Sequence, residues 1–173
     1  MTERRSPLII DDRSSGGLLA SNGASWRVVT DTVMGGKSMA RLVTAVVDGR
    51  PCISLTGEVS IENNGGFVQA SLDLSGSGAL DATGYTGIEM EIFGNNEQYN
   101  LHLRTEDTQI VWQSYRASFN APPCWTTLWL PFDSFRSHRI GQPMDLSKLR
   151  RLGLVCIGRK VEANLSISRL CFR

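Results

Sequence analysis

Hydrophobic and polar positions alternate with a period of two over most of the chain, and apolar stripes at helical spacing are nearly absent. In the segment 88–92, the apolar residues share one face, whereas Glu89 and Glu91 lie on the other, as a half-buried strand requires. The segment 99–104 alternates in the same way, with Tyr99 on its apolar face and Arg104 on its polar face. We expect further strands at 26–29, 38–47, 52–61, 67–72, 110–117, 125–130, 152–157 and 165–172.

This pattern predicts an all-β protein, because many short strands separated by turns are typical of a β-sandwich or barrel. The dipeptide Asp48-Gly49 indicates a two-residue hairpin. The segment 125–130 is apolar or aromatic on both alternating faces, which favours a central strand. Only 145–151 has a helical character, with Asp145 as the expected N-cap of one or two turns.

The chain of 173 residues, 41% of them hydrophobic, predicts a single domain over 1–173 that needs neither disulfides nor metals. With 18 basic and 17 acidic side chains the net charge is +1, so we expect no nucleic-acid partner and at most a peripheral membrane contact. Apolar runs fall far short of the roughly 20 residues that cross a bilayer. The segment 1–12 lacks the features of a secretory or mitochondrial signal, which predicts a cytoplasmic protein.

Motifs for metal, cofactor or catalytic chemistry are missing from the sequence. The four cysteines are widely spaced and only His102 and His138 could assist them, so we predict buried free thiols and no metal or cofactor. Gly36-Lys37-Ser38 is only a fragment of a phosphate-binding loop, and a β-like run follows it. No nucleophile elbow or zinc-protease motif occurs, so we do not expect an enzyme.

Two segments with paired glycines are the most informative motifs. The first runs from Trp26 through Asp31 to Met34-Gly35-Gly36-Lys37-Ser38, and the second is Asn63-Asn64-Gly65-Gly66-Phe67. Each glycine pair lies beside loop-favouring residues at the edge of an apolar run, which indicates turns with positive φ. Because Asp31 lies in a turn before the first pair, we expect its side chain to accept hydrogen bonds from backbone N–H groups.

These motifs resemble the complex I intermediate-associated protein 30 family, whose members read roughly Trp-x-x-Val-x-Asp-x-Val-Met-Gly-Gly-x-Ser and later Asn-Asn-Gly-Gly-Phe. The similarity continues to Leu152-Gly153-Leu154, although Gly94-Asn95-Asn96 replaces the usual Gly-Asp-Gly and Tyr115-Arg116 replaces Tyr-Gln. The resemblance implies a galactose-binding-like jelly-roll β-sandwich. It also implies a non-enzymatic, protein-binding assembly chaperone whose clients are respiratory complex I subunits or intermediates. Its binding residues would be Trp26, Asp31, Met34, Gly35, Gly36, Ser38, Asn63, Asn64, Gly65, Gly66 and Phe67.

A second hypothesis is a carbohydrate- or small-ligand-binding jelly roll. If the strand at 110–117 alternates regularly, Trp112 and Arg116 share a polar-aromatic face with Arg104, which suits a sugar or a peptide. The alternative is that Trp112 and Tyr115 are core residues of the sandwich. Basic residues also crowd the last third of the chain, where they indicate either a solvated rim or a patch for acidic proteins or lipid headgroups; they are Arg136, Arg139, Lys148, Arg150, Arg151, Arg159 and Lys160.

Overall fold

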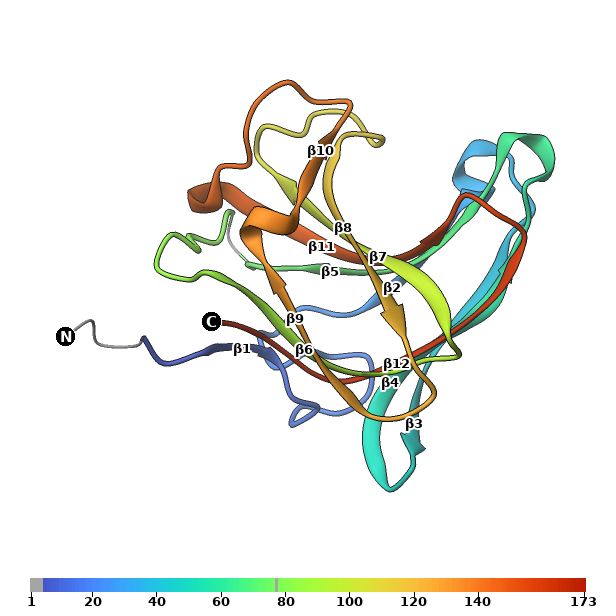
Figure 1. Ribbon diagram of the computed structural model, residues 1–173, viewed down its shortest axis with the longest axis horizontal. Helices are drawn as coiled ribbons and strands as arrows, with labels where there is room; N and C mark the ends of the chain where they lie inside the picture. Colours follow the sequence, from blue (N-terminus) through green and yellow to red (C-terminus); the bar gives the residue numbers. More distant parts are fainter. Residues whose placement is uncertain (1–4, 77) are drawn as a thin grey trace.

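The structure is a computed structural model that describes residues 5–76 and 78–173. Within these ranges, two six-stranded antiparallel sheets pack face to face as a β-sandwich (Figure 1). In spatial order, the first sheet contains β3 (Met39–Val47), β4 (Arg50–Val59), β12 (Val161–Phe172), β6 (Gly87–Phe93) and β9 (Thr126–Pro131), and β1 (Leu8–Asp11) also pairs with β12. The second contains β10 (Arg136–His138), β8 (Ser114–Ala121), β7 (Glu97–Thr105), β11 (Leu149–Ile157), β5 (Phe67–Asp73) and β2 (Arg27–Thr30).

The core lies between the sheets and is built by the alternation seen in the sequence. Met90 on β6 and Leu101 on β7 are fully buried, and both belong to one apolar cluster with the inward side chains of β11 and β12. The outward Glu89 and Glu91 of β6 instead form ion pairs on the first sheet, for example from Glu89 to Arg169 at 3.2 Å. The predicted all-β sandwich is therefore confirmed.

The turns follow from local sequence. Asp48 and Gly49 have φ values of 49° and 77°, which both central positions of a type I′ turn require, and they join β3 to β4 as predicted. The expected helical segment is η4 (Leu146–Lys148), a 3₁₀ turn in which the Asp145 carboxylate accepts a hydrogen bond from the Ser147 amide at 3.0 Å. Further 3₁₀ turns are η1 (Asp31–Met34), η2 (Glu62–Asn64) and η3 (Phe132–Ser134).

Two strand predictions were wrong. The strand expected at 110–117 begins only at Ser114, because the Gln113 side chain accepts hydrogen bonds from the amides of Gln109 and Ile110 and folds this segment into a turn. The strand expected to be central at 125–130 is β9, which ends the first sheet. On its outer face Trp129 is 44% exposed. Just before β9, the Trp125 ring contacts Phe93, and its indole N–H donates to a backbone carbonyl.

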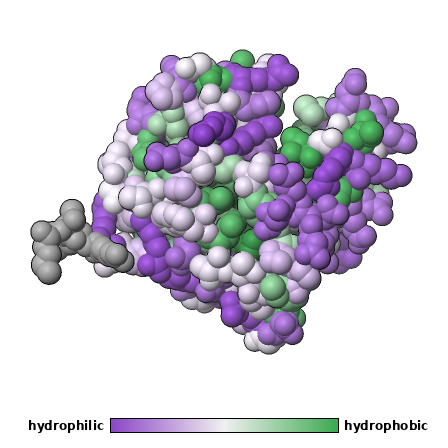
Figure 2. Space-filling model, in the orientation of Figure 1, coloured by the Kyte–Doolittle hydropathy of each residue, from purple (hydrophilic) through white to green (hydrophobic). Residues whose placement is uncertain are grey.

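The second sheet curves, so that its outer face forms a hollow between two raised ends, here called the concave face (Figure 1). One end carries the turns at 31–37 and 61–66, and the other carries the loops at 106–113 and 139–145. Figure 2 shows the same hollow between two lobes of the surface. Across residues 5–76 and 78–173, none of the helical segments is long and apolar enough to reach across a bilayer.

Candidate binding site

The two glycine-pair motifs meet at the carboxylate of Asp31, which is fully buried. One oxygen, Oδ1, accepts a hydrogen bond from the Ser38 amide at 2.9 Å. The other, Oδ2, accepts from the Ser38 hydroxyl and from the amides of Gly66 and Phe67, at 2.6 and 3.2 Å for the two amides. Asp31 therefore accepts backbone N–H groups, as the sequence predicts, and joins turns that lie 35 residues apart. We call this arrangement the Asp31 junction.

Two different physical needs explain the four glycines. Gly35 and Gly66 have φ values of 85° and 141°, a region that favours glycine, as predicted. Gly36 and Gly65 do not have positive φ. A Cβ on Gly65 would lie 2.6 Å from Asp31 Oδ2, and one on Gly36 would overlap Oδ1. One glycine of each pair thus permits the turn, and the other makes room for the carboxylate.

Hydrogen bonding keeps the junction carboxylate ionised. Burial by itself raises the pKa of Asp31, but the hydrogen bonds from Ser38, Gly66 and Phe67 outweigh this effect and leave the pKa below its ordinary value. Asp31, Ser38 and Gly66 are buried, so they shape the surface above them and do not themselves face a partner. Asn63 and Asn64, with φ values of 55° and 59°, complete the turn on its exposed side.

Trp26 does not belong to this surface. Its side chain is 1% exposed, and its indole N–H donates to Asp11 Oδ2 at 2.8 Å. The same oxygen binds the Arg13 guanidinium at 2.6 Å, and both charged side chains are almost completely buried. The prediction that Trp26 contacts a partner is therefore corrected: it anchors the segment before β2 to β1.

Large apolar side chains surround the Asp31 junction on the outside. Val33 is 70% exposed, Met34 54%, Met39 72% and Ile61 59%, and we call this group the apolar tip. Figure 2 shows hydrophobic atoms in the lobe that carries these turns. An ion pair of 3.5 Å between Lys37 and Glu62 links the two turns at their surface. The tip is thus an exposed apolar surface on a braced backbone.

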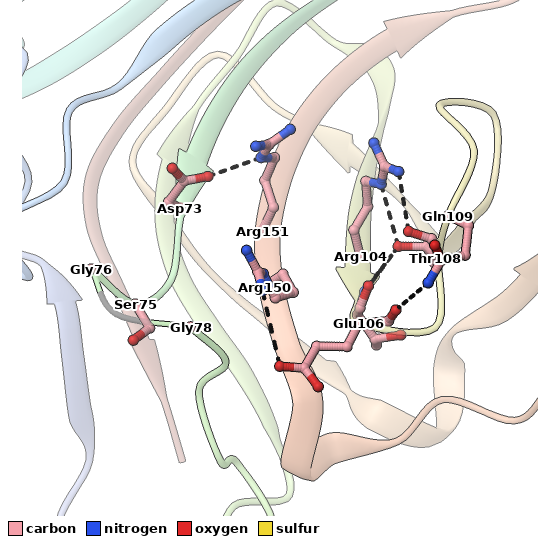
Figure 3. Close-up of a pocket in the computed structure, with 11 residues that line it drawn as sticks. Asp73, Ser75, Gly76, Gly78, Arg104, Glu106, Thr108, Gln109, Arg150 and Arg151 are labelled. Carbon is pink, nitrogen blue, oxygen red and sulfur yellow. Dashed lines mark hydrogen bonds and ion pairs between the residues drawn. The ribbon is translucent and has the colours of Figure 1, made fainter.

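Arginines dominate the concave face at its other end. The register places Arg104 of β7 directly opposite Arg151 of β11, and Arg116 of β8 directly opposite Arg136 of β10. Figure 3 shows the Arg104 and Arg151 side chains extending in the same direction from neighbouring strands. Of the predicted ligand residues, Arg104 and Arg116 therefore do share one face, and the structure adds Arg151 to them.

His102 lies between these arginines, opposite Arg116 across β7 and β8. It is 9% exposed, and among the described residues its Nε2 is the one buried side-chain nitrogen or oxygen without a hydrogen-bond partner. Burial, together with the nearby charges of Arg116 and His138, lowers the pKa of His102 to about 3. The ring is therefore uncharged at neutral pH.

Trp112 is placed differently from the prediction. It lies in the turn before β8, where Ile110, Val111 and Trp112 are 40%, 63% and 54% exposed. It therefore neither fills the core nor lines the strands beside Arg104, whereas Tyr115 is a core residue. The polar-aromatic face expected for sugar stacking is instead a polar, arginine-rich face with an apolar loop at its rim.

The described residues contain no cluster of three or more His, Cys, Asp or Glu side chains that could hold a metal ion. All four cysteines are free, and Cys52, Cys156 and Cys171 are buried as expected. Cys124 is exposed, which departs from the prediction of buried thiols.

The two packed antiparallel sheets are a β-sandwich that proteins of known structure share. The solved structures that it resembles include the family 11 carbohydrate-binding module of a cellulosomal cellulase from Clostridium thermocellum, with a TM-score of 0.74, 14% identity, and coverage of 96% of this chain and 94% of that one. A family 11 module from C. thermocellum in complex with a mixed-linked tetrasaccharide has a TM-score of 0.73 and 13% identity, and the match covers 96% of this chain and 94% of that one. A family 30 module from C. thermocellum has a TM-score of 0.59 and 16% identity, and the match covers 98% of this chain and 94% of that one. At these identities the likeness shows the fold alone.

The sequence itself matches the family described as complex I intermediate-associated protein 30 over residues 10–167, so the protein belongs to that family. This match spans both glycine-pair motifs and the strands that carry the concave face. A comparison with curated protein sequences found no significant match.

Proposed function

We propose that the protein is a non-enzymatic binding module that assists the assembly of a respiratory complex, with complex I subunits or intermediates as its clients. The observation that carries this proposal is the family match over residues 10–167. The name of that family, complex I intermediate-associated protein 30, links its members to intermediates of complex I. A cytoplasmic location remains a prediction.

The apolar tip is the surface on which we place client binding. Exposed apolar groups gathered on one surface mark protein interaction sites in soluble proteins, and methionine adapts to differently shaped partners because its side chain is flexible and polarisable. Val33 and Met34 lie on η1, directly above the Asp31 junction. Since the junction fixes the backbone that carries these side chains, little backbone freedom is lost when they bind a client.

A capture experiment tests this assignment. The tagged protein is incubated with detergent-solubilised membranes of its own host, and retained proteins are identified by mass spectrometry. The proposal expects complex I subunits with the wild type and a strong loss with Met34→Glu, because a charge at the centre of an apolar contact would be desolvated without a partner.

The matched control is Val46→Glu. Val46 is 71% exposed, as apolar as the tip, and lies at the end of β3 opposite Met39. It should leave capture unchanged. Failure of the wild type to retain complex I subunits would contradict the function, and equal losses in both variants would contradict the placement of the site.

A second candidate function is carbohydrate or small-ligand binding on the concave face. It is supported by the shared fold with carbohydrate-binding modules. Trp112, in the loop at the rim of this face, is an exposed ring that could stack on a sugar, whereas Tyr99 and Tyr115 are buried in the core. A glycan array probed with the wild type and with Trp112→Ala would test it. If the wild type binds none of the glycans, this candidate function is excluded.

A further inference from the structure

The arginines of the concave face lie close together on neighbouring strands although their positive charges repel one another. Like charges directly opposite each other on neighbouring strands destabilise a sheet, yet Arg104 faces Arg151 across β7 and β11. Burial and the charge of Arg151 both lower the pKa of Arg104, which shows the strain on its charged form. A bound anion between the two guanidiniums would relieve it.

Neutral acceptors hold these side chains in place and leave most of their charge uncompensated. Arg104 donates to the hydroxyl of Thr108 at 3.4 Å and to the carbonyl of Ile110 at 3.2 Å, and neither partner is charged. Arg116 donates from Nε to the Ser114 hydroxyl at 2.8 Å. Among the described ion pairs of these three arginines, only that of Arg151 with Asp73 supplies a carboxylate, and it uses Nε at 2.9 Å.

Arg104 and Arg151 both line a small cavity on the concave face. It has a volume of about 60 Å³, several times the space that one water needs, and its lining includes Arg104, Arg151, His102 and Gln69. Gly153 of β11 also lines the cavity, and its missing side chain makes room for the Gln69 amide, which a Cβ there would overlap. The cavity adjoins a depression of about 620 Å³ that shares Arg104 and Arg151 and is drawn in Figure 3.

His102 supplies an independent sign of a missing ligand. Its side chain is nine-tenths buried in the lining of this cavity, and its Nε2 has no partner. A buried polar atom without a hydrogen bond destabilises the fold by the full loss of its hydration, so such atoms are rare unless they serve a ligand. An uncharged imidazole that carries its proton on Nε2 can donate to an anionic oxygen.

We propose that this cavity binds a phosphate group, held by Arg104 and Arg151 with His102 beneath it. Phosphate fits better than a carboxylate, because its tetrahedral oxygens can face two guanidiniums and an imidazole at once. The phosphate can come from a soluble ester or from a lipid headgroup. This site is separate from the apolar tip, since Phe67 begins β5 at the tip and Asp73 ends β5 beside Arg151.

Titration with inorganic phosphate at constant ionic strength tests the site. The signals of His102 Nε2 and of the Arg104 and Arg151 side chains are followed by nitrogen-15 NMR. We expect saturable shifts at these groups, and the double variant Arg104→Gln/Arg151→Gln should weaken binding by about tenfold or more. The control Arg41→Gln removes one charge from an exposed position on β3 of the other sheet and should change affinity by less than about twofold.

A second arm separates the two sources of phosphate. Flotation with vesicles of phosphatidylcholine alone is compared with vesicles that also contain phosphatidylglycerol. Binding only to the vesicles that contain phosphatidylglycerol, and its loss in the double variant, assigns the site to lipid headgroups. Binding of inorganic phosphate, with no binding to either type of vesicle, assigns it to soluble esters.

Three results would overturn the proposal. The first is no saturable shift at about 50 mM phosphate, well above a millimolar Kd, together with no vesicle binding. The second is an equal loss of affinity in Arg41→Gln, which would mean unspecific attraction by charge. The third is undiminished binding by a double variant whose circular dichroism and unfolding midpoint without phosphate match the wild type.

Discussion

Replacing Asp31 by asparagine should strongly destabilise the protein although the shape of the side chain hardly changes. If the amide oxygen takes the place of Oδ2, it keeps the hydrogen bonds from Ser38 Oγ, Gly66 and Phe67, but their acceptor is no longer charged. The amide nitrogen then replaces Oδ1 and faces the Ser38 amide, so two donors meet at a separation of 2.9 Å. Hydrogen bonds to charged groups contribute about 1.5–3 kcal/mol and neutral ones about 0.5–1.5, while an unsatisfied buried donor costs about 1–3.

Together these terms lower the free energy of unfolding by about 4 kcal/mol, a large share of the roughly 5–15 kcal/mol that stabilises a domain. For a chain of this length the midpoint of thermal unfolding falls by roughly 8–16 °C. Urea unfolding measures the loss directly. The control is Asp81→Asn, because the Asp81 carboxylate accepts two hydrogen bonds from Thr83 in an exposed loop and should be much less sensitive.

A loss below about 1 kcal/mol in Asp31→Asn would refute this account of the junction. Acid provides a second check on the same group. The pKa of Asp31 is lower in the folded protein than in the unfolded chain, so its contribution to stability is complete above the unfolded pKa and disappears as the pH falls through the folded pKa. The asparagine variant should lack this component of the acid transition.

Three further variants test separate parts of the structure by urea unfolding. The pKa of His102 is about 3 when folded and about 6.5 when unfolded, so stability falls as the pH drops below 6.5; between pH 7.5 and 5 the wild type should lose about 2 kcal/mol more than His102→Gln, and equal losses would contradict the assigned burial. Gly65→Ala should cost about 1–3 kcal/mol because its Cβ would lie 2.6 Å from the junction carboxylate, whereas Gly141→Ala, with open space around it, should be nearly neutral. Trp26→Phe removes a donor from the buried Asp11 carboxylate and should cost about 1.5–3 kcal/mol; a neutral result would mean that the remaining donors, Arg13 and Ser21, satisfy it.

The sequence predicts most strands because each has one buried and one solvated face. Where that condition fails, prediction fails as well. The segment 110–113 has apolar residues that suit a strand, but the Gln113 side chain bonds to two backbone amides and turns the chain. The segment 125–130 is apolar on both faces, yet β9 ends its sheet, and Trp125 is satisfied by packing against Phe93 and Arg50.

The sites were only partly predictable for a related reason. Turn-favouring residues indicate the two glycine-pair motifs, and the role of Asp31 as an acceptor for backbone N–H groups follows from its position in the first turn. No local rule shows that both motifs enclose one carboxylate. Arg104 and Arg116 follow from alternation on neighbouring strands. Arg151 does not, since its place beside Arg104 depends on the pairing of β11 with β7 and on an irregularity in their register between Leu149 and Arg151.

The pairing of β1 has a consequence for handling the protein. Along one edge of β12, the strand β4 pairs as far as Ile167. On the same edge, β1 pairs with β12 from Leu170 to Phe172. Trimming the chain past Asp11 would therefore open a gap of one strand's width beside β12. Unpaired edges of this kind invite a strand from another molecule. Shortened versions should form dimers or aggregates by pairing at this open edge, and adding a peptide with the sequence of β1 should return them to monomers.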